Sequence, residues 1–498
     1  RDLIITLFML GMMPFCFRRP FVGLLLFTLL AYMRLQDLAW GFAKVQRWSM
    51  YVAVLSFAGY FADSQRKYPI MDLRTWLLLG MMLQVGVGLF FAVGDAPVDL
   101  RGYTEYVKII AIAIFTTAVV RTREHVRILV WVTAMGLAFH GVKNGLHAVL
   151  KGGNLYIHHG PGGLMEDNND FALAIAMALP WVYYLSVSEV NPTLRKVLRW
   201  MVPLCALTVI STRSRGGTLS LGLCTAIMIW HSRNRLMGMV VGVAAVAAVI
   251  VLSPSEYKER LSTISSYEED GSAMGRLRAW KVALRMIDAH PIFGVGFNRF
   301  ALNHIAFEPN PTPAQREGGK ALVAHNSYFQ IWAESGTPAL IMYLSLIGLT
   351  FLDIWRIRRR GKRLYHDSWI LSYCTMFEAS LATFVLGSAF LNRAAFDLVY
   401  HLFATVMAFS LVARNQMSAD EDLIAGRVPG KTISSDPGAA PVELGPQRPR
   451  FRSVASRAEP AVPLKLRVLP TESNPVCGFT GFAWKSPADL PDRSSCGG

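Results

Sequence analysis

The fold is decided by residues 337–363, which read TPALIMYLSLIGLTFLDIWRIRRRGKR. The part up to Ile354 is mainly apolar and is long enough to cross a lipid bilayer as a helix. The basic residues that follow, between Arg356 and Arg363, have no acid among them. Such clusters mark the cytoplasmic side of a membrane protein. The stretch therefore predicts a membrane-spanning helix and also its direction.

The composition of the whole chain indicates the same class of protein. Hydrophobic residues make up 53% of the 498 residues, and the mean hydropathy of +0.34 exceeds that of a soluble domain. The net charge of +16 comes mostly from short loops between apolar blocks, so it does not indicate a nucleic-acid partner. The six cysteines form no disulfide framework, and no metal-ligand spacing or nucleotide-binding glycine pattern is present. We therefore expect no metal and no cofactor.

The apolar blocks predict an all-α polytopic membrane protein with about 12 to 13 transmembrane helices and one large loop, on the side away from the cytoplasm, that contains amphipathic helices. The predicted spans are residues 3–17, 21–33, 49–62, 73–93, 107–120, 126–145, 171–187, 198–211, 217–230, 236–252, 337–354, 369–390 and 398–412. An N-terminal transmembrane bundle, the loop, the C-terminal transmembrane helices and a tail then occupy residues 1–252, 253–326, 327–414 and 415–498. The tail lacks periodicity and is rich in Pro, Ser and Gly, which predicts a disordered cytoplasmic segment.

Counting outward from the basic cluster assigns a side to each loop. The loop 253–326 and the turn 211–217 fall on the opposite, outer side. Basic loops fall inside and acid-leaning loops outside, as the positive-inside rule requires, at residues 121–127, 189–199 and 231–235 and at residues 94–105 and 151–170, respectively. The basic loop 34–48 also falls outside, so the first two runs remain open as either a hairpin of spans or one kinked crossing.

The outer turn 211–217 carries two arginines that break this charge pattern. Arg213 and Arg215 are held at the outer face between two spans, which suggests that they bind an anion such as phosphate. Gly216 would let the backbone approach such a ligand closely. An ordinary turn whose arginines extend toward the membrane surface is the alternative.

A second arginine pair lies in an amphipathic helix predicted over residues 276–290. At 100° per residue, one face is formed by Leu277, Trp280, Ala283, Leu284 and Ile287, and the opposite face by Arg278, Lys281 and Arg285. Arg276 falls within the apolar arc at the helix start, where free backbone N–H groups favour an anion. This placement favours Arg276 over Arg278 as an anion ligand, although an arginine extending from the helix end would give the same pattern.

His325 lies on the same outer face, just before the helix that begins near Ser327. A neutral histidine can accept a proton from an attacking hydroxyl near neutral pH, and a structural histidine is the alternative. Two arginines from separate segments could bind a diphosphate while the histidine acts as the base. A sugar donor with a diphosphate head and a polyprenyl tail would suit this arrangement at the membrane interface.

Several short motifs, taken in order, resemble the O-antigen ligase and polymerase superfamily. They are Ser214-Arg215-Gly216, Gly275-Arg276 with Trp280, His290-Pro291 with Gly294-Val295-Gly296, and His325-Asn326-Ser327 with Glu334 and Gly336. The closest similarity is to exosortase-A-associated O-glycosylation ligases, through Arg1 to Pro14, Arg19-Pro20, Gly23, Trp40 to Ala43, Gly160-Pro161, Asp167 to Ala172 and Leu179-Pro180. The resemblance covers residues 1 to about 415 and departs from the family at residues 35–38, where the family usually carries a Pro-His pair.

The resemblance implies a metal-independent, inverting glycosyltransferase that needs no cofactor. Such a glycan ligase transfers a glycan from an undecaprenyl-diphosphate carrier to the hydroxyl of a lipid, protein or polysaccharide acceptor, at the periplasmic face of the bacterial inner membrane. By resemblance, Arg215 and Arg276 contact the diphosphate, with Arg213 and Arg278 as further candidates. His325 is the catalytic base or orients the acceptor.

Three polar residues on the outer side, Asp167, Asn168 and Asn169, are candidates for contact with the acceptor glycan. The alternative is that Asn169 or Asp170 caps the following helix. A polysaccharide polymerase of the same superfamily would use the same donor and residues. A lipid or polysaccharide transporter is disfavoured because the predicted spans are nearly free of charge, with Glu378 the main exception, and show no internal repeat.

Overall fold

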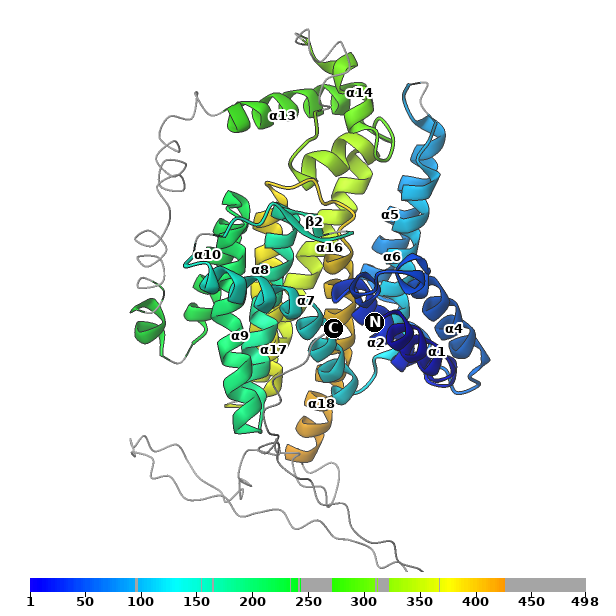
Figure 1. The fold of residues 1–498 in the computed structure, drawn as a ribbon. Helices are drawn as coiled ribbons and strands as arrows, with labels where there is room; N and C mark the ends of the chain where they lie inside the picture. Colours follow the sequence, from blue (N-terminus) through cyan, green and yellow to red (C-terminus); the bar gives the residue numbers. More distant parts are fainter. Residues whose placement is uncertain are drawn as a thin grey trace, which may run out of the picture. The chain divides into compact units, whose positions relative to one another are not determined.

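The computed structural model describes residues 1–94, 97–153, 155–163, 165–232, 234–240, 242, 271–309, 311, 322–366 and 368–425. All of them belong to one compact unit, Arg1–Ala440. This part of the chain is almost entirely helical (Figure 1), which confirms the predicted fold class. Its elements are α1 (Asp2–Arg18), α2 (Pro20–Tyr32), η1 (Leu35–Leu38), α3 (Phe42–Val45), α4 (Trp48–Ala62), α5 (Leu73–Gly88), η2 (Leu89–Phe91), α6 (Leu100–Val119), α7 (Arg123–Leu150), β1 (His159–Gly162), β2 (Met165–Asp167), α8 (Asn168–Ser188), α9 (Pro192–Ser211), α10 (Arg215–Trp230), α13 (Gly271–Ala289), α14 (Phe300–Phe307), α16 (Ser327–Leu364), α17 (Trp369–Ser388) and α18 (Asp397–Ile424).

Each predicted apolar run that falls within the described residues coincides with a helix. Within those residues, seven helical segments are long and apolar enough to cross a membrane: α5 with η2, α6, α7, α8, α16, α17 and α18. Two shorter apolar helices, α2 and α4, accompany them. The chain is therefore a polytopic helical membrane protein. The predicted run 236–252 and the start of the large loop lie mostly outside the described residues.

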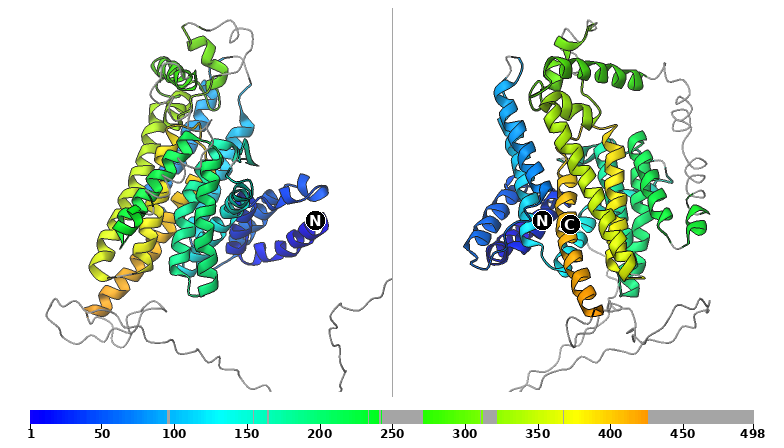
Figure 2. Two further views of the ribbon diagram at one scale, coloured as in Figure 1. Left: turned by 60° about the vertical axis from the view of Figure 1, so that its left-hand side comes forward. Right: turned by 180° about the vertical axis from the view of Figure 1, so that it is seen from behind.

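Helices α8 and α18 form the interior of the bundle. The most apolar stretch of each is 83% buried, as expected for a helix that is apolar on all sides and packs within protein. Helix α8 contacts α7, α9, α10 and α17, and Figure 2 shows these helices from two further directions. Helix α18 contacts α6, α7, α16 and α17. Helix α8 begins directly after the β1–β2 hairpin, and α18 begins after the loop that follows α17. The interior helices thus support these two connections.

The first two apolar runs form two separate helices. Helix α1 ends at Arg18, and α2 begins at Pro20, which occupies the first helical turn, where a proline is tolerated. Both helices contact α4 and each other. A small core of their own includes Met9, Leu26 and Val52, so these helices fold as a group beside the main bundle, joined to it where α2 contacts α7.

Helix α18 corrects the predicted start of the tail. The helix continues to Ile424, past residue 415, and Met417 and Asp420 are buried on it. The sequence from residue 415 shows too few apolar residues for a membrane span, but one buried helical face requires only a few. Residues 426–498, most of the predicted disordered tail, lie outside the described residues.

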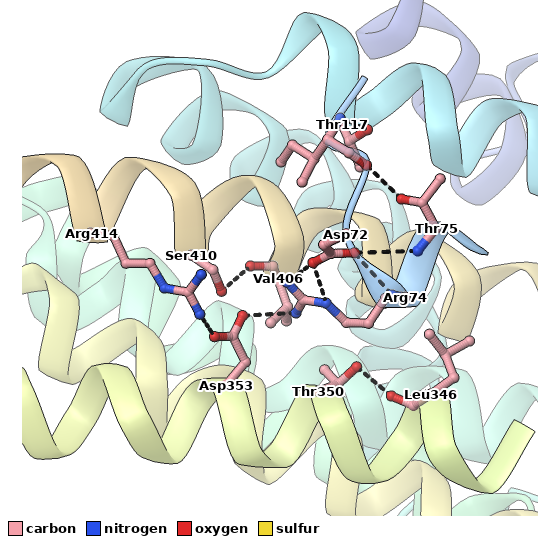
Figure 3. Close-up of polar contacts among 11 residues, drawn as sticks. Asp72, Arg74, Thr75, Thr117, Leu346, Thr350, Asp353, Val406, Ser410 and Arg414 are labelled. Carbon is pink, nitrogen blue, oxygen red and sulfur yellow. Dashed lines mark hydrogen bonds and ion pairs between the residues drawn. The ribbon is translucent and has the colours of Figure 1, made fainter. Parts of the chain in front are cut away.

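A buried ionic network corrects the prediction that Glu378 is the main charged residue in the spans. Asp353 of α16 lies between Arg74 of α5, at 2.8 Å, and Arg414 of α18, and Asp72 contacts Arg74 at 2.6 Å (Figure 3). Arg74 and Asp353 each stand near the end of a predicted span, so each resembles a boundary residue when the spans are considered one at a time. Only the packing of three helices places them together.

Candidate functional site

The segment that carries His325 leads directly into α16. Asn326 caps this helix, because its side-chain oxygen accepts hydrogen bonds from the backbone N–H groups of Tyr328 and Phe329 at 2.9 and 3.1 Å. His325 is exposed and has a φ of 47°, in the left-handed region that residues other than glycine seldom adopt. Such a conformation costs on the order of 1–3 kcal/mol and recurs at active sites.

The loop between α17 and α18, residues 389–396, fixes this segment by hydrogen bonds to the side chains of Asn326 and Ser327. The side-chain amide of Asn326 donates to the carbonyl of Ala389 at 3.1 Å. The hydroxyl of Ser327 donates to the carbonyl of Leu391 at 2.9 Å and accepts from the backbone N–H of Arg393 at 3.0 Å. Hydrogen bonds to the two residues after His325 restrict its position, as a preorganised site requires.

Helix α13 is held against the same segment. The indole N–H of Trp280 donates to the carbonyl of Ala324, the residue before His325, at 3.1 Å. The Trp280 ring also stacks on Phe329, with the ring centroids 5.7 Å apart. Arg276 lies four residues before Trp280 and so shares its side of the helix. Helix α13 therefore presents Arg276 toward the neighbourhood of His325.

The two candidate arginines of α13 differ in their surroundings, as predicted. Arg276 is half-buried. Arg278 is exposed on another face, where its Nε lies 3.8 Å from a carboxylate oxygen of Glu308. Of the two, only Arg276 lies on the side of α13 that also carries Trp280.

The buried face of α13 is nevertheless turned relative to the predicted one. The buried residues include Ala279, Val282 and Met286, whereas Leu284, which the helical plot places on the apolar face, is 45% exposed. This face packs in a cluster that includes Val295, Phe300 and Ala333. Contacts with distant parts of the chain thus select which apolar residues are buried, and the pattern of one helix does not contain that information.

The turn between α9 and α10 carries Arg213 and Arg215. Ser214 caps α10 by accepting a hydrogen bond from the backbone N–H of Gly217 at 3.1 Å, which places the exposed Arg215 at the first helical position. The guanidinium of Arg213 lies over the ring of Tyr156, 4.9 Å from its centroid. Arg213 also has a positive φ, of 53°. Arg213 therefore packs on an aromatic ring, whereas Arg215 is exposed at the first position of α10.

This turn packs against the loop 389–396 and against α8. A Cβ on Gly216 would lie 3.1 Å from the Cβ of Phe390, so a larger side chain there would push α10 away from the loop. The amide of Asn168 at the start of α8 donates to the carbonyl of Thr212 at 3.1 Å. The turn with Arg215 and the segment with His325 are therefore attached to the same loop.

The predicted acceptor residues lie where the β1–β2 hairpin enters α8. The helix is capped by Asp167, whose Oδ1 accepts from the backbone N–H and the side-chain amide of Asn169 at 2.8 and 2.9 Å. The predicted cap, Asn169 or Asp170, is thus the wrong residue. Strand β2 ends at Asp167, and α8 begins at the next residue. Asn168 contacts the neighbouring turn, and Asp170 binds Arg393.

Arg393 is the residue that sequence reasoning missed. It stands in the short loop between the predicted spans 369–390 and 398–412. The predicted topology places this loop on the outer side, where a basic residue breaks the positive-inside rule. The same signal identifies Arg213 and Arg215, and it could have identified Arg393.

The contacts bring the elements that carry Arg215, Arg276 and His325 together around the start of α16. Guanidinium groups from separate elements can form charge-assisted hydrogen bonds to a diphosphate, and an exposed histidine can exchange a proton with a hydroxyl. Across the residues that the structure describes, no three His, Cys, Asp or Glu side chains are arranged to hold a metal ion.

Residues 200–344 match a family described as O-antigen ligase. That range contains the turn with Arg215, the helix α13 and the segment with His325. Residues 1–187 match a family of unknown function, DUF5935. No curated protein matches the chain.

Proposed function

We propose that this chain, whose residues 200–344 match a family described as O-antigen ligase, is a glycosyltransferase that moves a glycan from an undecaprenyl-diphosphate carrier to an acceptor hydroxyl. The observation that carries the proposal is the attachment of the Arg215 turn, helix α13 and the His325 segment to one another around the start of α16. The cluster Arg356 to Arg363 supports an inner-membrane orientation in which this site faces the periplasm.

Arg215 and Arg276 bind the diphosphate of the donor in this mechanism. As the bond between the anomeric carbon and the diphosphate oxygen breaks, negative charge grows on the departing diphosphate. Guanidinium groups stabilise that charge through paired N–H donors, and they do so most strongly where charge develops in the transition state. The undecaprenyl tail remains among the apolar spans, so the reacting carbon is held at the membrane surface.

His325 receives the proton of the acceptor hydroxyl as that oxygen attacks the anomeric carbon from the side opposite the diphosphate. A new carbon–oxygen bond forms, undecaprenyl diphosphate leaves, and the configuration at the carbon inverts. The strained backbone of His325 and its hydrogen-bonded neighbours support a fixed direction for the imidazole. The arginines supply the positive charge, so no metal enters the mechanism, and transfer should continue in excess chelator.

The acceptor glycan binds in this proposal at the junction of β2 and α8, near Asp167, Asn168 and Asn169. The hydrogen bond from Asn168 to Thr212 links this junction to the turn that precedes Arg215. Carboxylate and amide groups suit the hydroxyls of a sugar because they accept and donate hydrogen bonds. The acceptor would then approach the donor from the side of α8.

A transfer assay with purified protein in detergent tests the proposal. The donor is an undecaprenyl-diphosphate-linked glycan, and the expected products are a glycosylated acceptor and free undecaprenyl diphosphate. A longer glycan that remains on the carrier would identify a polymerase instead. Donor that stays intact in detergent but crosses the membrane of a proteoliposome would identify a transporter and overturn the proposal.

A further inference from the structure

We propose that Arg393 is a positioning residue for the transfer reaction. Together with Asp170 it holds the His325 segment and the Arg215 turn in one arrangement. This inference rests on the function proposed above and adds a residue pair that binds neither donor nor acceptor.

The first observation is the ion pair between Arg393 and Asp170. The Asp170 side chain is only 5% exposed and that of Arg393 is 29% exposed. Burial acts to lower the pKa of Arg393, but the hydrogen bond and the charge of Asp170 outweigh it and raise this pKa. A carboxylate buried to this extent needs its cation, since an unpaired buried charge is strongly unfavourable.

The second observation is that the backbone of Arg393 contacts a different element from its side chain. Its N–H donates to the hydroxyl of Ser327, two residues after His325, at 3.0 Å. The next residue, Ala394, donates its N–H to the side-chain oxygen of Gln330 at 3.3 Å. The guanidinium therefore ties α8 to the loop, and the same residue's backbone ties the loop to the first turn of α16.

The third observation is the contact between the start of α8 and the turn that carries Arg215. Asp170 lies in the first turn of α8, two residues after Asn168, whose amide donates to the carbonyl of Thr212. The connection therefore runs from the Arg215 turn through the first turn of α8 to Arg393 and Ser327, and so to His325. Within α8 it passes through a single helical turn, which deforms little.

Group transfer is sensitive to such positioning. The attacking oxygen must lie about 3–3.5 Å from the reacting carbon, and a displacement of about 1 Å can reduce the rate about 100-fold. Without its guanidinium, the loop 389–396 keeps its hydrogen bonds to α16 but loses its ion pair to α8. His325 could then shift relative to the Arg215 turn while each side chain remains intact.

The experiment compares Arg393→Gln in two backgrounds, wild type and His325→Ala. We expect Arg393→Gln to lower kcat by about 10- to 100-fold in the first background and to add little in the second, because a positioning residue acts through the base. Donor affinity should change less than kcat. Arg393→Lys keeps the charge and should recover part of the loss, and thermal unfolding in detergent reports whether each variant is folded.

Arg414→Gln is the matched control. It also removes an arginine from a buried carboxylate, since Asp353 is 6% exposed and Arg414 is 49% exposed, but it lies in the network of α5, α16 and α18. We expect its effect on kcat to be small and equal in both backgrounds. An equal loss from Arg393→Gln in the two backgrounds, or no loss at all, would overturn the proposal.

Backbone hydrogen exchange separates this inference from the proposed function. Arg393→Gln should accelerate exchange in residues 322–330 and 389–396, and Arg414→Gln should not. This measurement needs no substrate. A wild-type protein that forms no product would overturn the proposed function alone, whereas unchanged exchange in Arg393→Gln would overturn the role of Arg393 whether or not product forms.

Discussion

Two ionic clusters in the described part of the chain combine the same groups in different surroundings. In the inner network (Figure 3), Asp353 joins Arg74 and Arg414 and so links three long helices through side chains alone. In the outer pair, Asp170 joins Arg393, which sits in a loop that also hydrogen-bonds to α16 through its backbone. The inner network connects elements that are already packed against each other. The outer pair connects the start of α8 to a loop that hydrogen-bonds to the start of α16.

The surroundings of the two clusters differ in a second way. The outer pair is attached to the exposed Arg215 turn and to His325, which has a left-handed backbone. Charged groups left at the surface beside a strained residue are typical of a site that acts on a ligand. The members of the inner network bind one another. We therefore propose that the outer pair positions the residues that carry out catalysis and that the inner network stabilises the bundle.

The largest expected effect tests whether the residues near the outer pair carry out catalysis. His325→Ala should lower kcat by about 10²–10⁴, the usual consequence of losing a general base. Donor affinity and thermal stability should change little, because the exposed imidazole contributes little packing. Turnover and donor binding measured in parallel would check this. Near-normal turnover in this variant would remove the catalytic role and leave both clusters structural.

The second prediction tests whether the inner network stabilises the helical bundle. Asp353→Ala leaves Arg74, whose side chain is 6% exposed, without its partner on α16. Arg74 keeps Asp72 as a partner at 2.6 Å, so the loss of stability should be smaller than the cost of about 3–5 kcal/mol for a buried charge left without a partner, but thermal unfolding in detergent should still occur at a lower temperature. The kcat of the fraction that remains folded should stay close to that of the wild type.

Replacing the three residues around Asp353 sharpens the same test. A variant with Arg74→Leu, Asp353→Leu and Arg414→Leu removes these three charges together, leaves Asp72 as the cap of α5, and should recover part of the lost stability, because apolar residues often replace buried ion pairs without loss. A specific loss of turnover in this stable variant would contradict the division of roles, and it would favour a charge-dependent function inside the bundle such as transport.

The third prediction concerns the two arginines as one anion site. A charge-assisted hydrogen bond is worth about 1.5–3 kcal/mol, so Arg215→Lys and Arg276→Lys should each weaken transfer about 10- to 100-fold, since lysine lacks the paired donors. If both residues bind one diphosphate, the double variant should lose less than the product of the two single losses. Strictly independent losses would separate the turn from α13.

Much of the fold could be predicted from the sequence because apolar length and loop charge are local properties. The helices and the candidates Arg215, Arg276 and His325 follow from such signals. The pairing of Arg393 with Asp170 and the Arg74–Asp353–Arg414 network did not, because these groups meet only when segments distant in the chain pack together. The cap at Asp167 and the exposed Leu284 have the same explanation: a short hairpin and a tertiary contact decided between residues that local patterns treat alike.

The smallest expected effect belongs to Arg278, which is the control for Arg276 on the same helix. Its side chain is 45% exposed, and its Nε lies 3.8 Å from a carboxylate oxygen of the buried Glu308, which is too long for a hydrogen bond. Arg278→Ala should therefore change donor affinity and kcat by less than about threefold, whereas Arg276→Ala should weaken both. Both variants replace arginine with alanine, two residues apart on the same helix. The comparison therefore isolates which side of α13 faces the donor. A larger loss from Arg278 than from Arg276 would reverse the orientation assigned to α13 and detach it from the outer cluster, even with the contact between Trp280 and Ala324 in place.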